Sequence, residues 1–141
     1  MKVSDIMTRY VEFIDPDASV KEAAELMGEL DVGGLPAGNE ARVEGVVTDR
    51  DILYRVVARG LDPTGVRVRD ILSRPVIACG EDDSLPAAMD IMAANHIRRM
   101  PVRDARGHVS GWITLADLAR KLLVESETVQ GALRAMTEPE G

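Results

Sequence analysis

The chain has 141 residues, of which 45% are apolar, and it carries a formal net charge of −7 and a single cysteine, Cys79. A chain of this length buries roughly two thirds of the surface that it exposes when unfolded, so we expect one compact domain, and one cysteine excludes an internal disulfide. The acidic excess and an aromatic content of 3% argue against nucleic acid as a partner. No apolar run approaches the length of a membrane span, and a lone cysteine fits a reducing compartment, so we expect a cytoplasmic protein with no membrane partner.

The first half of the chain predicts the order strand, helix, strand, strand, helix. Residues 10–14 (YVEFI) are short and β-prone, and Ser19 then opens a helix as a capping box with Glu22. Apolar residues at helical spacing predict that one face of this helix lies in the core: Val20, Ala23, Ala24, Met27 and Leu30. Residues 35–37 and 43–47 predict a hairpin across GNEAR, after which Thr48 caps a second helix that ends near Gly60.

The second half repeats this order after a linker that DPTG marks. It predicts strands over 76–79, 100–103 and 109–113, with DARGH as the hairpin turn, and a helix from Ser84 with Pro86 in its first turn. We therefore divide the chain into a first repeat (3–62), a linker (63–67), a second repeat (68–125) and a tail (126–141) that is expected to be partly helical, because Val129, Leu133 and Met136 fall at helical spacing.

The two halves also match residue by residue. VSDIMTR (3–9) matches VRDILSR (68–74), and the same offset of 65 places Leu35-Pro36 on Met100-Pro101. Beyond the glycine-rich turn the offset becomes 66, and GVVTDRD (45–51) matches GWITLAD (111–117). Two copies of a unit this long predict a pseudo-twofold pair rather than a solenoid, and the fold class is α/β, or more closely α+β.

The repeated pattern Gly-x-x-Thr-x-x-Asp suggests a nucleotide site. An apolar strand leads into a helix N-terminus, which favours a phosphate, and the threonine adds a hydroxyl at that point. One helical turn later the aspartate returns beside the threonine, where its carboxylate can accept both hydroxyls of a ribose. These residues are Thr48 with Asp51 and Thr114 with Asp117. The alternative is a simple helix cap, which is the better interpretation of one copy alone, but recurrence at the equivalent position favours a site.

The paired motifs resemble a tandem cystathionine-β-synthase (CBS) domain, or Bateman module. The openings VSDIMT and VRDILS, the central NHIRRMPV, and the closings GVVTDRD and GWITLAD stand in the family's order, over residues 3–124. The runs ELDVGGLP and TDRDILYRVVARGLDP are most similar to small stand-alone proteins of the hypoxic-response type.

This resemblance implies two β-α-β-β-α repeats packed with pseudo-twofold symmetry around two clefts that bind an adenosine-containing ligand, of the AMP, ADP, ATP, NAD or S-adenosylmethionine class. Asp51 and Asp117 would accept from the ribose, and Thr48 and Thr114 would contact phosphate or ribose. The adenine would lie against apolar side chains for which core packing is an equal alternative: Val11, Leu35 and Pro36, or Val76, Met100 and Pro101. Arg98 and Arg99 would reach the phosphates, although exposed arginines more often form only a solvated edge.

The two clefts are expected to be unequal. The first repeat has Gly33 and Gly34 where the second has Arg98 and Arg99. Asp49 and Asp51 would also repel a triphosphate unless a divalent cation such as Mg²⁺ accompanies it. We therefore expect the cleft with Asp117 to be the better site.

No catalytic or metal-binding constellation is evident in the sequence. His96 and His108 are the only imidazole bases and lie apart from Cys79, so we expect neither an enzyme nor a metal site, and no required cofactor. Two hypotheses remain: a sensor that binds an adenosine compound and modulates an unknown partner protein, or a structural dimer with vestigial sites. A homodimer is expected in either case, because the second helices carry broad apolar faces: Ile52, Leu53, Val56, Val57, Leu118, Leu122 and Leu123.

Overall fold

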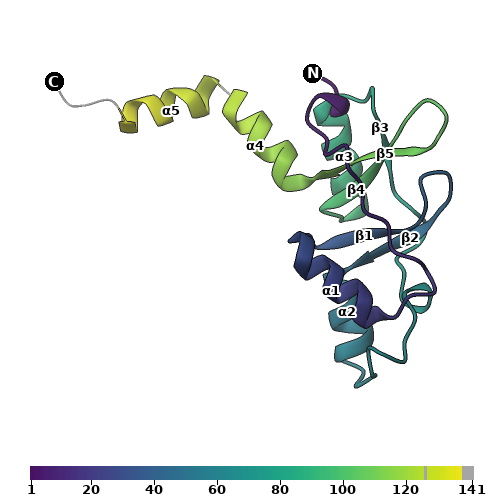
Figure 1. Cartoon of the computed structure of the whole chain (residues 1–141). Helices are drawn as coiled ribbons and strands as arrows, with labels where there is room; N and C mark the ends of the chain where they lie inside the picture. The colour runs from purple at the N-terminus through teal and green to yellow at the C-terminus, as the bar shows by residue number, and fades with distance from the viewer. Residues whose placement is uncertain (126, 138–141) are drawn as a thin grey trace.

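The computed structural model describes residues 1–125 and 127–137, and these form two lobes with two helices leading away from them (Figure 1). The lower lobe in Figure 1 holds α1 (Val20–Leu30), the hairpin of β1 (Gly34–Gly38) and β2 (Val43–Thr48), and α2 (Asp49–Ile52), which continues as a π-helical segment over Leu53–Val57. The other lobe holds β3 (Cys79–Gly80), α3 (Leu85–Asn95), β4 (Arg99–Arg103) and β5 (Val109–Thr114). The predicted mixture of helices and strands in two matching repeats is confirmed.

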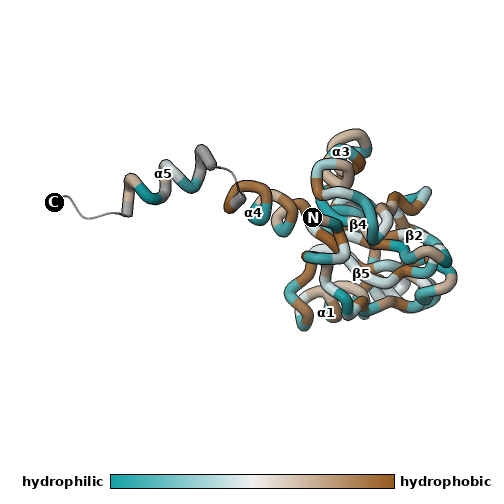
Figure 2. The backbone as a smooth tube through the Cα atoms, turned by 90° about the horizontal axis from the view of Figure 1, so that it is seen from above, coloured by the Kyte–Doolittle hydropathy of each residue, from teal (hydrophilic) through white to brown (hydrophobic). Residues whose placement is uncertain are grey.

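The last two helices leave the body of the molecule. Helix α4 (Leu115–Glu125) follows β5 directly, and α5 (Glu127–Thr137) continues outward from it, as both views show (Figures 1 and 2). Helix α4 carries alternating apolar and polar stretches in Figure 2, and its Leu118 is fully buried whereas Leu123 is 54% exposed. One part of α4 therefore anchors it to the second lobe while another faces solvent.

The first helix of each repeat begins at the serine that the sequence predicts, although only the serine's half of the predicted capping box with Glu22 is formed. Ser19 Oγ accepts from the backbone N–H of Glu22 at 3.1 Å, and Ser84 Oγ accepts from that of Ala87 at 3.2 Å. Each helix then ends on a left-handed residue that is not glycine, at φ angles of 54° and 53°, and these two residues, Asp31 and His96, are equivalent in the repeat. Non-glycine residues in this conformation are uncommon and often lie at functional sites.

The predicted core face of α1 is narrower than its apolar spacing suggested. Val20, Ala23 and Met27 are buried, but Ala24 is exposed and Leu30 is 40% exposed. These two positions are therefore corrections to the sequence interpretation, because Leu30 lies at the wall of a cavity between the lobes and Ala24 faces solvent.

The first strand of each repeat is far shorter than predicted. In the first repeat only Ile14 pairs with the sheet, as a parallel bridge to Ala37, and in the second only Cys79–Gly80 pairs with β4. Extending these ladders backwards by two residues would require backbone N–H groups from Pro36 and Pro101, and proline has none. The prolines therefore end the pairing in both copies, and residues 10–13 and 76–78 run alongside the sheets without joining them.

The two repeats exchange their opening segments. The 3₁₀ turn Val3–Asp5 packs into the core of the second lobe, and the matching turn Val68–Asp70 packs into the core of the first. The backbone bridges are reciprocal: Lys2 to Ser84 and Arg67 to Ser19 at one end, Thr8 to Trp112 and Ser73 to Val46 at the other. This exchange makes the pseudo-twofold pair one interlocked body, and it places the N-terminus beside α3 (Figure 1).

The repeated glycine of the closing motif allows the exchanged segments to approach. A Cβ atom added at Gly45 would lie 2.9 Å from Ser73 O and 3.0 Å from Leu72 Cβ, and one at Gly111 would lie 3.1 Å from Thr8 O. All three distances are shorter than an ordinary van der Waals contact. The glycine of Gly-x-x-Thr-x-x-Asp thus serves the fold in both copies.

Candidate functional site

Two cavities lie where the lobes meet, and each is built from both repeats. The first, of about 830 Å³, lies beside the start of α4 and is called here the Thr114 cleft; the second, of about 1080 Å³, lies beside the start of α2 and is called the Thr48 cleft. In the Thr114 cleft the opening segment and β1 of the first repeat face the β5–α4 junction of the second. In the Thr48 cleft the relation is reversed, so the two clefts are pseudo-symmetric counterparts.

The carboxylate of Asp51 already has hydrogen-bond and ion-pair partners within the protein. It is the one buried charged side chain in the described residues, 7% exposed, and it accepts from the backbone N–H of Thr48 at 2.9 Å. Thr48 Oγ1 in turn accepts from the Asp51 N–H at 3.1 Å, which completes a capping box. The Ser73 hydroxyl donates to both carboxylate oxygens, at 2.9 and 3.1 Å, and Arg55 Nε lies 3.9 Å away. Thr48 and Asp51 both line the Thr48 cleft, as predicted for a binding site. They also form the helix cap that was the alternative interpretation of the motif.

The equivalent residues of the second repeat are more open. Thr114 lines the Thr114 cleft, and its Oγ1 accepts from the backbone N–H of Asp117 at 3.2 Å. The Asp117 side chain is 32% exposed and lies 3.7 Å from Arg120 Nη1, one turn along α4. Leu115, Ala116 and Ala119 complete this wall, whereas Asp117 is not among the lining residues.

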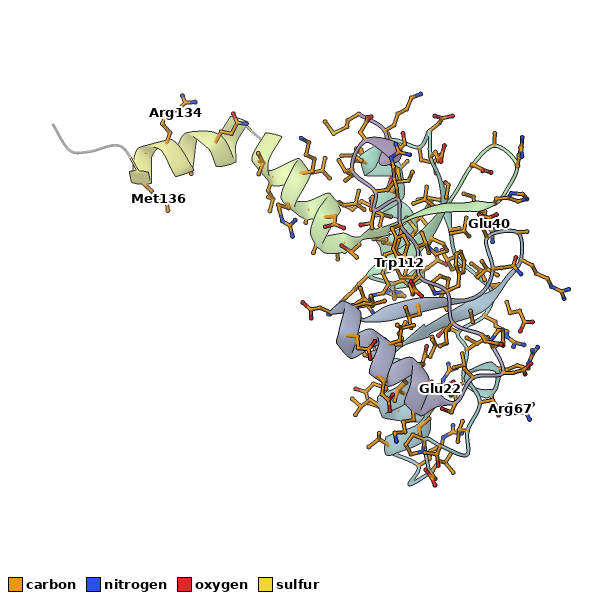
Figure 3. All side chains as sticks on the ribbon, in the orientation of Figure 1. Glu22, Glu40, Arg67, Trp112, Arg134 and Met136 are labelled. Carbon is orange, nitrogen blue, oxygen red and sulfur yellow. The ribbon has the colours of Figure 1, made fainter. Side chains whose placement is uncertain are left out.

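The predicted apolar residues separate into two groups. Val11, Leu35 and Pro36 line the Thr114 cleft together, beside Trp112, which lies between the two lobes in Figure 3. Leu35 and Pro36 are also buried, so the alternative of core packing applies to them as well. The second predicted set is not brought to either cleft. Met100 and Pro101 are buried, and Val76 is half-buried, next to Pro75 and Ile77, which line the Thr48 cleft in its place.

The two arginines line both clefts. Arg99 Nη1 donates to the backbone oxygen of Gly33 at 2.8 Å and lies 3.5 Å from Asp49 Oδ1. One guanidinium group therefore contacts a lining residue of each cleft. An added Cβ on Gly33 would lie 2.7 Å from Arg99 Nη2, and one on Gly34 would lie 2.8 Å from Arg99 Cδ. The glycine pair therefore makes room for Arg99, and the expectation that it leaves one cleft without a guanidinium is wrong, because both arginines line both clefts.

Several lining residues escaped the sequence interpretation. Thr8 and Ser73 are equivalent hydroxyl residues of the two opening motifs, and each lines the cleft of the repeat with which its segment is exchanged. Asp31 and His96, the left-handed helix ends, occupy equivalent places in the two clefts. The recurrence of Thr/Ser in the aligned openings was the available signal for the first pair; the sequence offered no signal for the second.

The single cysteine and the possible metal ligands were considered separately from the two clefts in the sequence, and the structure describes both. Burial, with a smaller contribution from Asp83, raises the pKa of the Cys79 thiol from 9.0 to about 11, so this cysteine is a poor nucleophile at neutral pH. Within residues 1–125 and 127–137, no three His, Cys, Asp or Glu side chains gather closely enough to hold a metal ion. No helix of that part is long and apolar enough to cross a bilayer.

The fold and its two clefts are those of a tandem-repeat module, and comparison with known proteins identifies its family. The family model described as CBS domain matches residues 3–58 and 68–124. The chain therefore belongs to the CBS domain family, as the motifs had predicted.

The relatives include the type of small protein that the sequence resembled. Hypoxic response protein 1 of Mycobacterium tuberculosis (strain H37Rv) is 33% identical over 119 residues, which are 84% of this chain and 82% of that protein. Among solved structures, a CBS domain protein of unknown function from Thermoplasma acidophilum superposes with a TM-score of 0.81 at 26% identity, over 98% of this chain and 78% of that one. A CBS domain pair solved in complex with 5′-methylthioadenosine and S-adenosyl-L-methionine gives a TM-score of 0.79 over 89% of this chain and 98% of that one; at 24% identity this similarity concerns the fold.

Proposed function

We propose that this CBS pair is a regulatory module that binds an adenosine-containing compound in the clefts between its repeats and, in response, changes the surface that it presents to a partner protein. The observation that carries the proposal is the composition of the Thr114 cleft. It combines an apolar wall (Val11, Leu35, Pro36), the hydroxyl of Thr114 at the start of an 11-residue helix, and two guanidinium groups. An apolar slot for a base beside donors for polar groups suits a nucleoside, and about 830 Å³ lies within the usual size of small-molecule sites.

The fold supports the same ligand class. A CBS pair with this architecture holds two adenosine compounds, 5′-methylthioadenosine and S-adenosyl-L-methionine. The clefts of this chain are built from side chains of both repeats, so a ligand that contacts both walls would favour one relative placement of the lobes. A ligand that binds one arrangement better than another shifts the population toward it, which is the minimum that regulation requires.

We also propose that the protein self-associates through its second helices. Leu53 and Val57 are 52% and 61% exposed on the segment after α2, and Leu123 and Val124 are 54% and 53% exposed on α4. Leu53 and Val57 lie one turn apart, and Leu123 and Val124 are consecutive. Apolar side chains this exposed favour pairing with a second copy as a homodimer. The dimer surface would also serve the alternative function, a structural module without a ligand.

A thermal-shift panel tests the ligand class. The full chain is heated with adenosine, 5′-methylthioadenosine, AMP, ATP, NAD and S-adenosylmethionine, with guanosine and GTP as matched controls. A ligand at a hundredfold excess over its Kd adds about 2.7 kcal/mol to the free energy of unfolding. At least one adenosine compound is expected to raise Tm while its guanine counterpart does not. Unchanged Tm with every adenosine compound would contradict the proposal and favour the structural alternative.

A further inference from the structure

The two clefts differ in charge although their architecture matches. The Thr48 cleft is lined by four guanidinium groups, Arg50, Arg55, Arg98 and Arg99, against the carboxylates of Asp49 and Asp51. The Thr114 cleft shares Arg98 and Arg99 but sets them against the carboxylates of Glu12 and Asp31. The first cleft therefore has an excess of two positive charges and the second has none.

The carboxylates of the Thr48 cleft are already engaged by cations. Asp49 Oδ1 lies 3.5 Å from Arg99, and Asp51 is buried with Arg55 at 3.9 Å and the Ser73 hydroxyl at 2.9 Å. The repulsion that these two residues were expected to exert on a triphosphate is therefore offset within the protein. The positive charge that remains comes from Arg50 and Arg98, which are both exposed at the cleft.

Equivalent positions of the repeat account for the difference. At the left-handed end of the first helix, the Thr48 cleft has the imidazole of His96 and the Thr114 cleft has the carboxylate of Asp31. Two residues after the capping threonine, the first has Arg50 and the second has Ala116. Both exchanges make the Thr48 cleft more favourable to an anion than the Thr114 cleft. The exchange of Asp49 for Leu115 acts in the opposite direction, but Asp49 is paired with Arg99.

The Thr114 cleft is also the more apolar of the two. Its wall includes Leu30, Val32 and Leu115 in addition to the side chains described above, and its Glu12 accepts from the Tyr10 hydroxyl at 2.8 Å. A polyphosphate placed there would lose hydration without gaining a net positive partner, whereas an uncharged nucleoside would lose little.

We propose that the two clefts divide adenosine compounds by charge: the Thr48 cleft binds a di- or triphosphate, and the Thr114 cleft binds an adenosine compound without phosphate. This inference rests on the proposed function and deepens it. A module of this kind responds to two ligands, because a phosphorylated and an unphosphorylated adenosine compound can be bound at the same time. Arg99 lines both clefts, so a ligand in one cleft can change the affinity of the other cleft through this side chain.

Calorimetric titrations of the full chain with ATP and with 5′-methylthioadenosine test the division. Arg50→Ala gives the Thr48 cleft the residue that the Thr114 cleft has at this place, and Val32→Trp narrows the Thr114 cleft at a side chain that is 37% exposed. Arg50→Ala is expected to weaken ATP binding about tenfold or more, through loss of a charge-assisted contact, and to leave 5′-methylthioadenosine binding within about twofold. Val32→Trp is expected to do the reverse.

The outcomes separate the two proposals. Equal weakening of both ligands by Arg50→Ala, or loss of ATP binding in Val32→Trp, would overturn the division while leaving an adenosine module intact. Competition of the two ligands for one site in the unmodified protein would overturn it as well. Binding of neither ligand to the unmodified protein would instead contradict the proposed function itself. Circular dichroism of both variants checks that the fold is retained. Ala116→Arg gives the Thr114 cleft the residue that the Thr48 cleft has at this place, and because this position is exposed, the variant is expected to leave ATP affinity undiminished.

Discussion

The matching aspartates of the two repeats are expected to differ sharply in their importance for stability. Asp51→Ala removes the acceptor of the Thr48 N–H and of the Ser73 hydroxyl and leaves Arg55 without its buried partner. A hydrogen bond to a charged group contributes about 1.5–3 kcal/mol, and the freed donors regain part of this from water in the cleft. We therefore expect a loss of about 2–4 kcal/mol in the free energy of unfolding.

Asp117→Ala is the matched control at the equivalent position. Its carboxylate is 32% exposed, and its pair with Arg120, which is 72% exposed, spans 3.7 Å. Exposed pairs contribute about 1 kcal/mol at most, so the expected loss is about 1 kcal/mol or less. Urea denaturation followed by circular dichroism at one protein concentration measures both values. Losses that agree within about 0.5 kcal/mol would refute the reasoning, because it depends on the different burial of the two carboxylates.

Three further predictions follow from other parts of the fold. Gly45→Ala is expected to cost about 1–3 kcal/mol of stability, because its Cβ would meet the backbone oxygen of Ser73 at 2.9 Å, whereas Gly28→Ala, with nothing within 4 Å, should be neutral or stabilising in the same denaturation assay. Since the pKa of Cys79 is raised from 9.0 to about 11, the unfolded chain releases this proton first, and the free energy of unfolding should fall by about 2 kcal/mol as pH rises between these values; an equal fall in Cys79→Ala would contradict this. Val57→Glu should convert a dimer into a monomer in light scattering, and a dimer that persists unchanged would exclude this face.

Local features of the fold could be predicted from the sequence because they depend on neighbours along the chain. Ser19 and Ser84 cap their helices as expected, and the hairpins form across the turns that GNEAR and DARGH mark. The first strands are shorter than β-propensity predicts, because a ladder also needs a backbone N–H donor on the partner strand. Pro36 and Pro101 were visible in the sequence and lack the required N–H.

The candidate site was less predictable because the repeats exchange segments. The sequence interpretation placed the clefts between the repeats but did not say which apolar set faces which threonine; in the structure Thr114 of the second repeat shares a cleft with Val11 and Pro36 of the first. Met100 and the equivalent Leu35 are both buried, because each packs in a core cluster with the opening segment of the other repeat. Contacts between residues this far apart along the chain cannot be predicted from local periodicity.

A crystal structure of the full chain grown with saturating 5′-methylthioadenosine tests the central claim most directly. The account predicts an adenine ring in the Thr114 cleft, against Pro36 and Val11, with the ribose toward the start of α4. Both clefts free of ligand at saturation, or a ligand bound only on the outer surface of one lobe, would contradict the claim that the clefts between the repeats are the binding sites.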